Sequence, residues 1–150
     1  GREYALQQYH FHTPSEHRIQ GARADMEMHL VHRDAQGRIA VVAVLMNGGR
    51  RINSTLKRIA DALPRMAGES FYGRQVATNP LFLLPPERSY FSYPGSLTTP
   101  PCTEGVDWFV MAEPVEVDGA LVARFRQAMG ANARPVQPDN ARPVLRFSRR

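Results

Sequence analysis

One short segment of this chain alternates in polarity and carries a histidine at every second position. The run is Gln8-Tyr9-His10-Phe11-His12. Because the side chains of a β-strand point to opposite faces in turn, the imidazoles of His10 and His12 lie on one face, with the Gln8 amide beside them. This pattern constrains the segment to a strand whose polar face gathers imidazole groups.

A second alternating segment supplies a third histidine. It is Glu27-Met28-His29-Leu30-Val31. If residues 13–25 connect the two segments as an antiparallel pair, His29 lies opposite His10 and His12. A lone histidine on a strand is more often a core or surface residue, but this spacing brings three neutral imidazoles together. Such a set is typical of a catalytic zinc site that keeps its fourth position open to water.

Polar residues flank these histidines on the same strand faces. Gln8 lies two residues before His10, and Glu27 lies two residues before His29. A metal-binding histidine usually gives its second N–H to a carboxylate, an amide or a carbonyl. We therefore expect Gln8 and Glu27 to orient the imidazoles of His10 and His29.

Composition limits the class of protein without identifying it. The 150 residues, 43% hydrophobic and 22% charged, fit one folded domain over residues 1–150. The net charge of +5 comes from scattered basic residues without a nucleic-acid-binding motif, so no nucleic-acid partner is expected. No apolar run approaches the ~20 residues of a membrane span, and the first residues lead into a strand rather than a signal peptide. Cys102 is the only cysteine, so no disulfide forms within the chain.

The hydrophobic pattern predicts a mainly β domain with two short helices. Apolar residues at helical spacing predict one helix over 52–63, which ends before Pro64, and another between an Asp118 cap and Gly130. Turns are expected at 47–49 and 94–95, little regular structure at 71–88, and an extended tail at 132–147. Strands are expected at 4–12, 26–32, 39–46, 91–93 and 106–112, and the third of them is apolar throughout and therefore central.

Five segments carry the most specific signal. They are Gln8-Tyr9-His10-Phe11-His12-Thr13-Pro14-Ser15-Glu16-His17, Glu27-Met28-His29-Leu30-Val31-His32, Tyr93-Pro94-Gly95-Ser96-Leu97-Thr98-Thr99-Pro100-Pro101, Trp108 and Asn132-Ala133-Arg134-Pro135-Val136-Gln137-Pro138. Together and in this order they resemble the α-class carbonic anhydrases, especially bacterial ones. The resemblance implies a large, twisted, mostly antiparallel central sheet with a few short peripheral helices. It also implies reversible hydration of carbon dioxide to bicarbonate and a proton, and this family is itself the standard example of a three-histidine zinc enzyme.

The resemblance assigns a role to each matching residue. His10, His12 and His29 correspond to the zinc ligands, with Gln8 and Glu27 as the groups that orient them. The implied cofactor is one Zn²⁺ ion, which would use water as its fourth ligand.

Further residues correspond to the catalytic pair and to the substrate pocket. In the implied arrangement, Glu16 accepts a hydrogen bond from the Thr98 hydroxyl, so the Thr98 oxygen accepts from the zinc-bound hydroxide and directs its attack. His17 and His32 match structural positions of the family. The implied pocket for carbon dioxide and bicarbonate consists of Val31, Val41, Leu97, Thr99, Val106 and Trp108.

The chain departs from the family pattern at its start. Family members carry a further segment before the Gln8 strand, so the resemblance implies an N-terminally truncated domain. Such a domain lacks the histidine that shuttles protons, lacks a cysteine partner for Cys102 and exposes a sheet edge. We therefore expect slower, buffer-dependent turnover. The alternative function is a catalytically impaired zinc-binding or interaction module.

Another metal site and several partners follow from the same residues. His10, His12 and Glu16 also mimic the first motif of cupins, in which the glutamate is a ligand, but no histidine follows His32 to complete that site. The resemblance implies sulfonamide and anion inhibitors, a homodimer, and a periplasmic or secreted location.

Overall fold

The computed structural model describes residues 1–64 and 78–148, and its main element is a central mixed sheet. The strand order is β1-β4-β5-β7-β6-β9, and β8 also pairs with β5. The pairs are antiparallel except β5 with β7 and β5 with β8, which are parallel. The strands of this sheet are β1 (Ala5–His12), β4 (Met26–Arg33), β5 (Ile39–Gly49), β6 (Tyr90–Ser96), β7 (Glu104–Met111), β8 (Val115–Asp118) and β9 (Leu145–Phe147).

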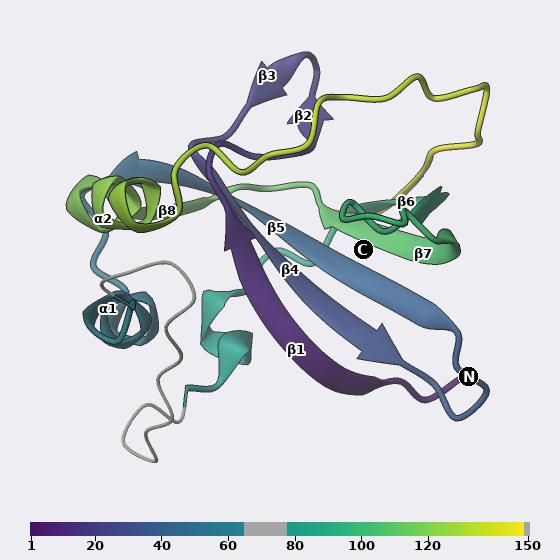
Figure 1. Ribbon diagram of the computed structural model, residues 1–150, viewed down its shortest axis with the longest axis horizontal. Helices are drawn as coiled ribbons and strands as arrows, with labels where there is room; N and C mark the ends of the chain where they lie inside the picture. Colours follow the sequence, from purple (N-terminus) through teal and green to yellow (C-terminus); the bar gives the residue numbers. More distant parts are fainter. Residues whose placement is uncertain (65–77, 149–150) are drawn as a thin grey trace.

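The two histidine-bearing strands are neighbours, as predicted. β1 and β4 pair antiparallel, with His10 opposite His29. Their connection forms a separate hairpin of β2 (Arg18–Ile19) and β3 (Ala22–Arg23). Figure 1 shows β1, β4 and β5 lying side by side, with this hairpin beyond one end of the sheet. The alternation of polarity predicted both strands, and the assumption that residues 13–25 connect them predicted their antiparallel pairing.

The central strand is longer than its apolar run. β5 is buried over most of 40–46, as expected, but it continues through Gly49, where a turn was predicted. The reason is a parallel pairing of Met46–Gly49 with Val115–Asp118 of β8. A strand partner that lies so far along the chain overrides the local turn preference of asparagine and glycine.

The predicted turn at 94–95 is also part of a strand. β6 includes Pro94 and Gly95, which pair with β7. Its other neighbour, β9, pairs only with Tyr90 to Ser92, so the proline, which lacks an N–H, lies where that side of the strand needs no donor. A Cβ at Gly95 would lie 2.8 Å from Trp108 Cδ1, so the ring of Trp108 requires glycine here.

Both predicted helices form, and their buried side chains pack with strand residues that face away from the histidines. α1 (Ser54–Asp61) begins after an Asn53 cap, and α2 (Gly119–Met129) begins after the predicted Asp118 cap and ends at Gly130. Figure 1 shows them together at one end of the sheet, beside β8. Side chains of both helices, such as Leu56 and Phe125, join one buried core cluster. The shortness of both helices agrees with a mainly β fold.

Segments without long strands or helices connect these elements. A 3₁₀ helix forms at Pro80–Leu83, and the rest of 78–89 is irregular, as the prolines predict, whereas residues 71–77 lie outside the described residues. The tail is irregular from 130 to 144 and ends in β9, a strand that was not predicted. Among the described helices, none has the length and apolar character needed to cross a membrane.

Candidate metal centre

Three histidines lie together on one face of the sheet. Their ring centroids are 5.0 Å apart for His10 and His12, 5.3 Å for His10 and His29, and 4.5 Å for His12 and His29. One ring nitrogen from each lies within 4.8 Å of the other two, which suits a shared metal ion. His10 and His29 border a cavity, so the group has one open side.

Two of the rings are held from behind by side chains. Gln8 Oε1 lies 2.8 Å from His10 Nδ1, and Glu27 Oε1 lies 2.8 Å from His29 Nε2. Both oxygens accept, so these ring nitrogens carry the protons. The opposite nitrogens, His10 Nε2 and His29 Nδ1, are left with lone pairs that a metal can take.

The third ring shows that the group is suited to a cation. His12 Nδ1 lies 3.4 Å from the backbone oxygen of Asn132, and its Nε2 is buried without a hydrogen-bond partner. Within the described residues, the other buried side-chain atom without a partner is Glu16 Oε2. A buried polar atom without a partner costs free energy, so the lone pair of His12 Nε2 is suited to a bound cation. Three neutral imidazoles are a donor set that zinc prefers.

The protonation states of the rings agree with metal binding. Burial, followed by the nearby charges of His29 and His12, lowers the pKa of His10 to about 4. Burial and His29 also lower the pKa of His12. A metal competes with protons for ring nitrogens, so these shifts keep both rings neutral and ready to bind at neutral pH.

Glu27 is a hydrogen-bond centre rather than a ligand. It is fully buried, and its Oε2 accepts from the backbone N–H groups of Glu16 and His17, both at 2.8 Å. Its Oε1 accepts from the rings of His17 and His29. Burial raises the pKa of Glu27, but the charge and hydrogen bond of His17 and the hydrogen bond of His29 outweigh it and hold the pKa well below its usual range. All four acceptor positions of the carboxylate are used, so His17, Glu27 and His29 do not form a second metal site.

Sequence reasoning did not assign Tyr93 to the site. Its hydroxyl lies 2.7 Å from His17 Nε2, and its ring is parallel to that of Trp108, 6.2 Å away. Burial raises the pKa of Tyr93, which keeps the phenol protonated. Tyr93 therefore extends the chain of hydrogen bonds from His29 through Glu27 and His17. Its place in the third motif was a signal, but its partner depends on the pairing of β6 and β7.

Replacing Tyr93 with phenylalanine is expected to lower the free energy of unfolding by about 1–2 kcal/mol, because His17 Nε2 loses its partner in a largely buried place. Urea unfolding of the metal-free protein measures this change. Tyr90→Phe is the matched control, since Tyr90 lies on the same strand and its hydroxyl has no hydrogen bond to another described residue. An equal effect of both substitutions would contradict the role given to the Tyr93 hydroxyl.

The tail reaches the site through Asn132 and Arg134. The Asn132 amide accepts from the backbone N–H of Thr13 at 2.8 Å and donates to the backbone oxygen of Phe11 at 3.1 Å, on either side of His12. The backbone N–H of Arg134 donates to Glu16 Oε1 at 2.7 Å. The irregular tail is therefore fastened to the histidine strand.

A cavity of about 290 Å³ opens over the histidines. Glu16 is buried and does not belong to the lining, and its Oε2 has no hydrogen-bond partner, so the pairing of Glu16 with Thr98 stays a prediction. Val106 is fully buried in the adjoining apolar cluster with Val41 and Trp108 rather than in the lining. The other residues predicted for the substrate pocket do line the cavity: Val31, Val41, Leu97, Thr99 and Trp108, as does Thr98.

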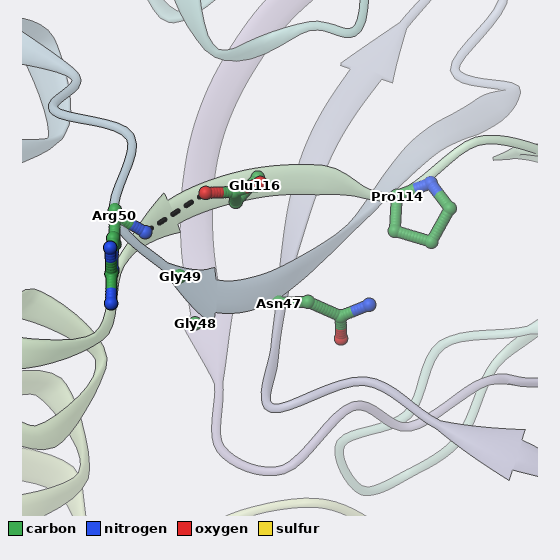
Figure 2. Close-up of a pocket in the computed structure, with 6 residues that line it drawn as sticks. All are labelled: Asn47, Gly48, Gly49, Arg50, Pro114 and Glu116. Atoms are coloured by element: carbon green, nitrogen blue, oxygen red, sulfur yellow. Dashed lines mark hydrogen bonds between the residues drawn. The ribbon is translucent and has the colours of Figure 1, made fainter.

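A second, more open hollow lies at the far end of β5 and has a volume of about 440 Å³. Figure 2 shows its lining from β5 and β8, with the backbone N–H of Arg50 donating to Glu116 Oε1 at 2.9 Å. Neither of the buried atoms without a partner belongs to this lining. The histidine cavity is therefore the candidate site.

Comparison with known proteins agrees with this geometry. A family model described as eukaryotic-type carbonic anhydrase matches residues 1–150. The chain belongs to the carbonic anhydrase family. The carbonic anhydrase of Nostoc sp. is 44% identical over 144 residues, which cover 96% of this chain and 54% of that protein. This chain therefore spans about half the length of that relative.

Solved carbonic anhydrase structures have the same fold. The α-carbonic anhydrase of Photobacterium profundum is 44% identical with a TM-score of 0.90, over 96% of this chain and 65% of that one. The enzyme from Thermovibrio ammonificans, solved with the inhibitor sulfanilamide, gives the same identity and TM-score over 96% of this chain and 63% of its own. The bacterial, α-class resemblance and the predicted fold are thus confirmed.

Proposed function

We propose that this protein catalyses the zinc-dependent, reversible hydration of carbon dioxide to bicarbonate and a proton. The observation that carries the proposal is the convergence of three ring nitrogens, one of them buried and unpaired, whose opposite nitrogens are all held by acceptors. Membership of the carbonic anhydrase family supports it.

The proposed ligands are His10, His12 and His29, with Gln8 and Glu27 fixing the rings of His10 and His29. A zinc ion held by these residues would supply a hydroxide nucleophile at neutral pH, a chemistry for which carbonic anhydrase is the standard example. Because both oxygens of Glu27 already accept hydrogen bonds, the ring of His29 cannot rotate without leaving a buried donor unpaired.

Other residues of the cavity wall have separate proposed roles in binding the substrate and orienting the nucleophile. Val31, Val41, Leu97 and Trp108 form an apolar surface that suits carbon dioxide, and the Thr99 hydroxyl helps to hold bicarbonate. We infer that the unpaired Oε2 of Glu16 accepts a hydrogen bond from the Thr98 hydroxyl, so that the Thr98 oxygen can act only as an acceptor and orients the nucleophile.

Proton release from this cavity depends on solvent. Within the described lining, the imidazoles are those of His10 and His29, and both are proposed ligands. The other side chains of this lining are amides, hydroxyls, a guanidinium, an indole and aliphatic groups, so the proton leaves to water or to buffer. Turnover should therefore rise with buffer concentration.

Metal analysis combined with stopped-flow hydration tests the proposed function. We expect one zinc per chain, hydration that increases with buffer concentration, and inhibition by sulfanilamide, which is bound by the Thermovibrio enzyme. Stoichiometric zinc without hydration would favour the alternative of a binding or interaction module. Failure to bind zinc would contradict the metal centre itself.

Other expectations from the resemblance are not needed for this function. Inhibition by small anions, a homodimer, a periplasmic or secreted location and a single domain over residues 1–150 stay predictions.

A further inference from the structure

One cationic side chain lies at the wall of the histidine cavity. On β4, the side chains of Glu27, His29, Val31 and Arg33 share one face, and Arg33 lines the same cavity as His29. Among the described residues that line this cavity, Arg33 is the one with a permanent charge. It is exposed, so it lies at the mouth rather than the floor.

The Arg33 guanidinium has N–H groups that no acceptor of the described residues uses. One of its N–H groups donates to the backbone oxygen of Gly37 at 2.9 Å, and no carboxylate of the described residues lies within 4.0 Å of it. Arg38 and Arg124, by contrast, are paired with Asp34 and Asp61. A guanidinium carries five N–H groups in a planar fork that matches a carboxylate, so Arg33 can bind one without losing a protein partner.

An irregularity in β1 places an amide close to the same mouth. The pairing of β1 with β4 shifts register between Leu6 and Gln8, so Gln7 is an extra residue. As a result, Gln7 and Gln8 both line the cavity, although neighbours on a regular strand point to opposite faces. The Gln7 Nε2 group donates to the backbone oxygen of Ala5, and its second N–H remains for a ligand.

The two ends of the cavity differ in chemistry. Arg33 lies four positions after His29 on an extended strand, which corresponds to about 13 Å between their Cα atoms. The wall between them is apolar and includes Val31, Ile39 and Val41. We propose that Arg33 and Gln7 form a subsite for a carboxylate, carried by an elongated ligand with an apolar middle whose other end is bound at the histidines. This proposal rests on the proposed function, because the histidine end requires the metal centre.

Paired benzenesulfonamides test the subsite in the zinc-loaded protein. Each pair carries a para-linker of zero to three carbons that ends in a carboxylate or in the neutral carboxamide. Calorimetry is expected to show the carboxylate of the longer pairs binding about two- to fivefold more tightly than the carboxamide, the range for an exposed ion pair. Added salt should reduce this preference, because it screens exposed charges.

Variants separate the subsite from the overall charge of the protein. Arg33→Gln should abolish the preference while the carboxamides bind as before, and Arg33→Lys should retain most of it. Arg18→Gln removes the same charge from the separate β2–β3 hairpin, outside the cavity lining, and should leave the preference intact. An unchanged preference in Arg33→Gln, or an equal loss in Arg18→Gln, would overturn the subsite.

The neutral probes show which proposal fails. If the carboxamides bind but the carboxylates have no advantage in the unaltered protein, the subsite is wrong and the metal centre stands. If neither member of any pair binds, the proposed function fails, and the subsite fails with it.

Discussion

Replacing His10 with alanine is expected to lower zinc affinity about a hundred- to thousandfold, because structural zinc sites bind with about 10–16 kcal/mol that is shared by about four ligands. Hydration of carbon dioxide should fall with zinc occupancy. His10 is the least buried of the three histidines, so its removal leaves the core largely unchanged. Competition with a chromophoric chelator measures the affinity, and stopped-flow hydration measures the activity.

His32→Ala is the matched control for this substitution. His32 lies on β4, three residues after His29 but on the other face, and its Nδ1 lies 2.9 Å from the backbone oxygen of Leu30. Zinc affinity should therefore stay within a fewfold of the unaltered protein. Equal losses from both substitutions would mean that the effect comes from the fold and not from the predicted ligand.

Replacing Glu27 with glutamine should destabilise the metal-free protein by about 2–4 kcal/mol and weaken zinc binding about 10- to 100-fold. The buried carboxylate accepts four hydrogen bonds: two from backbone N–H groups and two from the rings of His17 and His29. An amide has one oxygen and one NH₂ group. In either orientation of the amide, the NH₂ group would face two of the N–H donors from which the carboxylate accepts. The His29 ring can relieve this only by moving its proton to Nδ1, the nitrogen that faces the metal centre.

Urea unfolding in the presence of chelator and zinc titration of the folded protein give the two effects separately. Glu113→Gln, at an exposed turn position, makes the same chemical change and should alter neither quantity. If Glu27→Gln destabilised the protein but left zinc affinity unchanged, the inferred control of the His29 proton would be wrong.

The placement of the three histidines was accessible from the sequence because it depends on local periodicity. Two residues of spacing put His10 and His12 on one face in any strand, and the same rule put Glu27 with His29. The antiparallel pairing followed from one further assumption, that residues 13–25 form a short connection, and the observed register agrees with it. Helix caps at Asp118 and Gly130 were likewise local signals.

Contacts between segments far apart in the chain could not be predicted from the sequence in this way. The ring of His12 is hydrogen-bonded to the backbone oxygen of a residue 120 positions away. The ring of His17 is hydrogen-bonded to the hydroxyl of a tyrosine 76 positions away. A backbone oxygen has no sequence signature, since every residue carries one. The strand character of Pro94 and of Gly48 and Gly49 also depended on partners in β7 and β8 that override local turn preference.

Local chemistry thus decided which side chains share a face, which of them can bind a metal and which polar neighbours accompany them. The three-dimensional fold decided which ring nitrogens form hydrogen bonds and which stay free, and it placed the backbone N–H of Arg134 against Glu16. It also decided that Val106 packs in the core and that Arg33 lines the cavity mouth. The physical reason is that alternation along a strand is a property of neighbouring residues. Hydrogen-bond partners and burial are instead set by strand pairing across the whole chain, where the free energy of packing outweighs local preference.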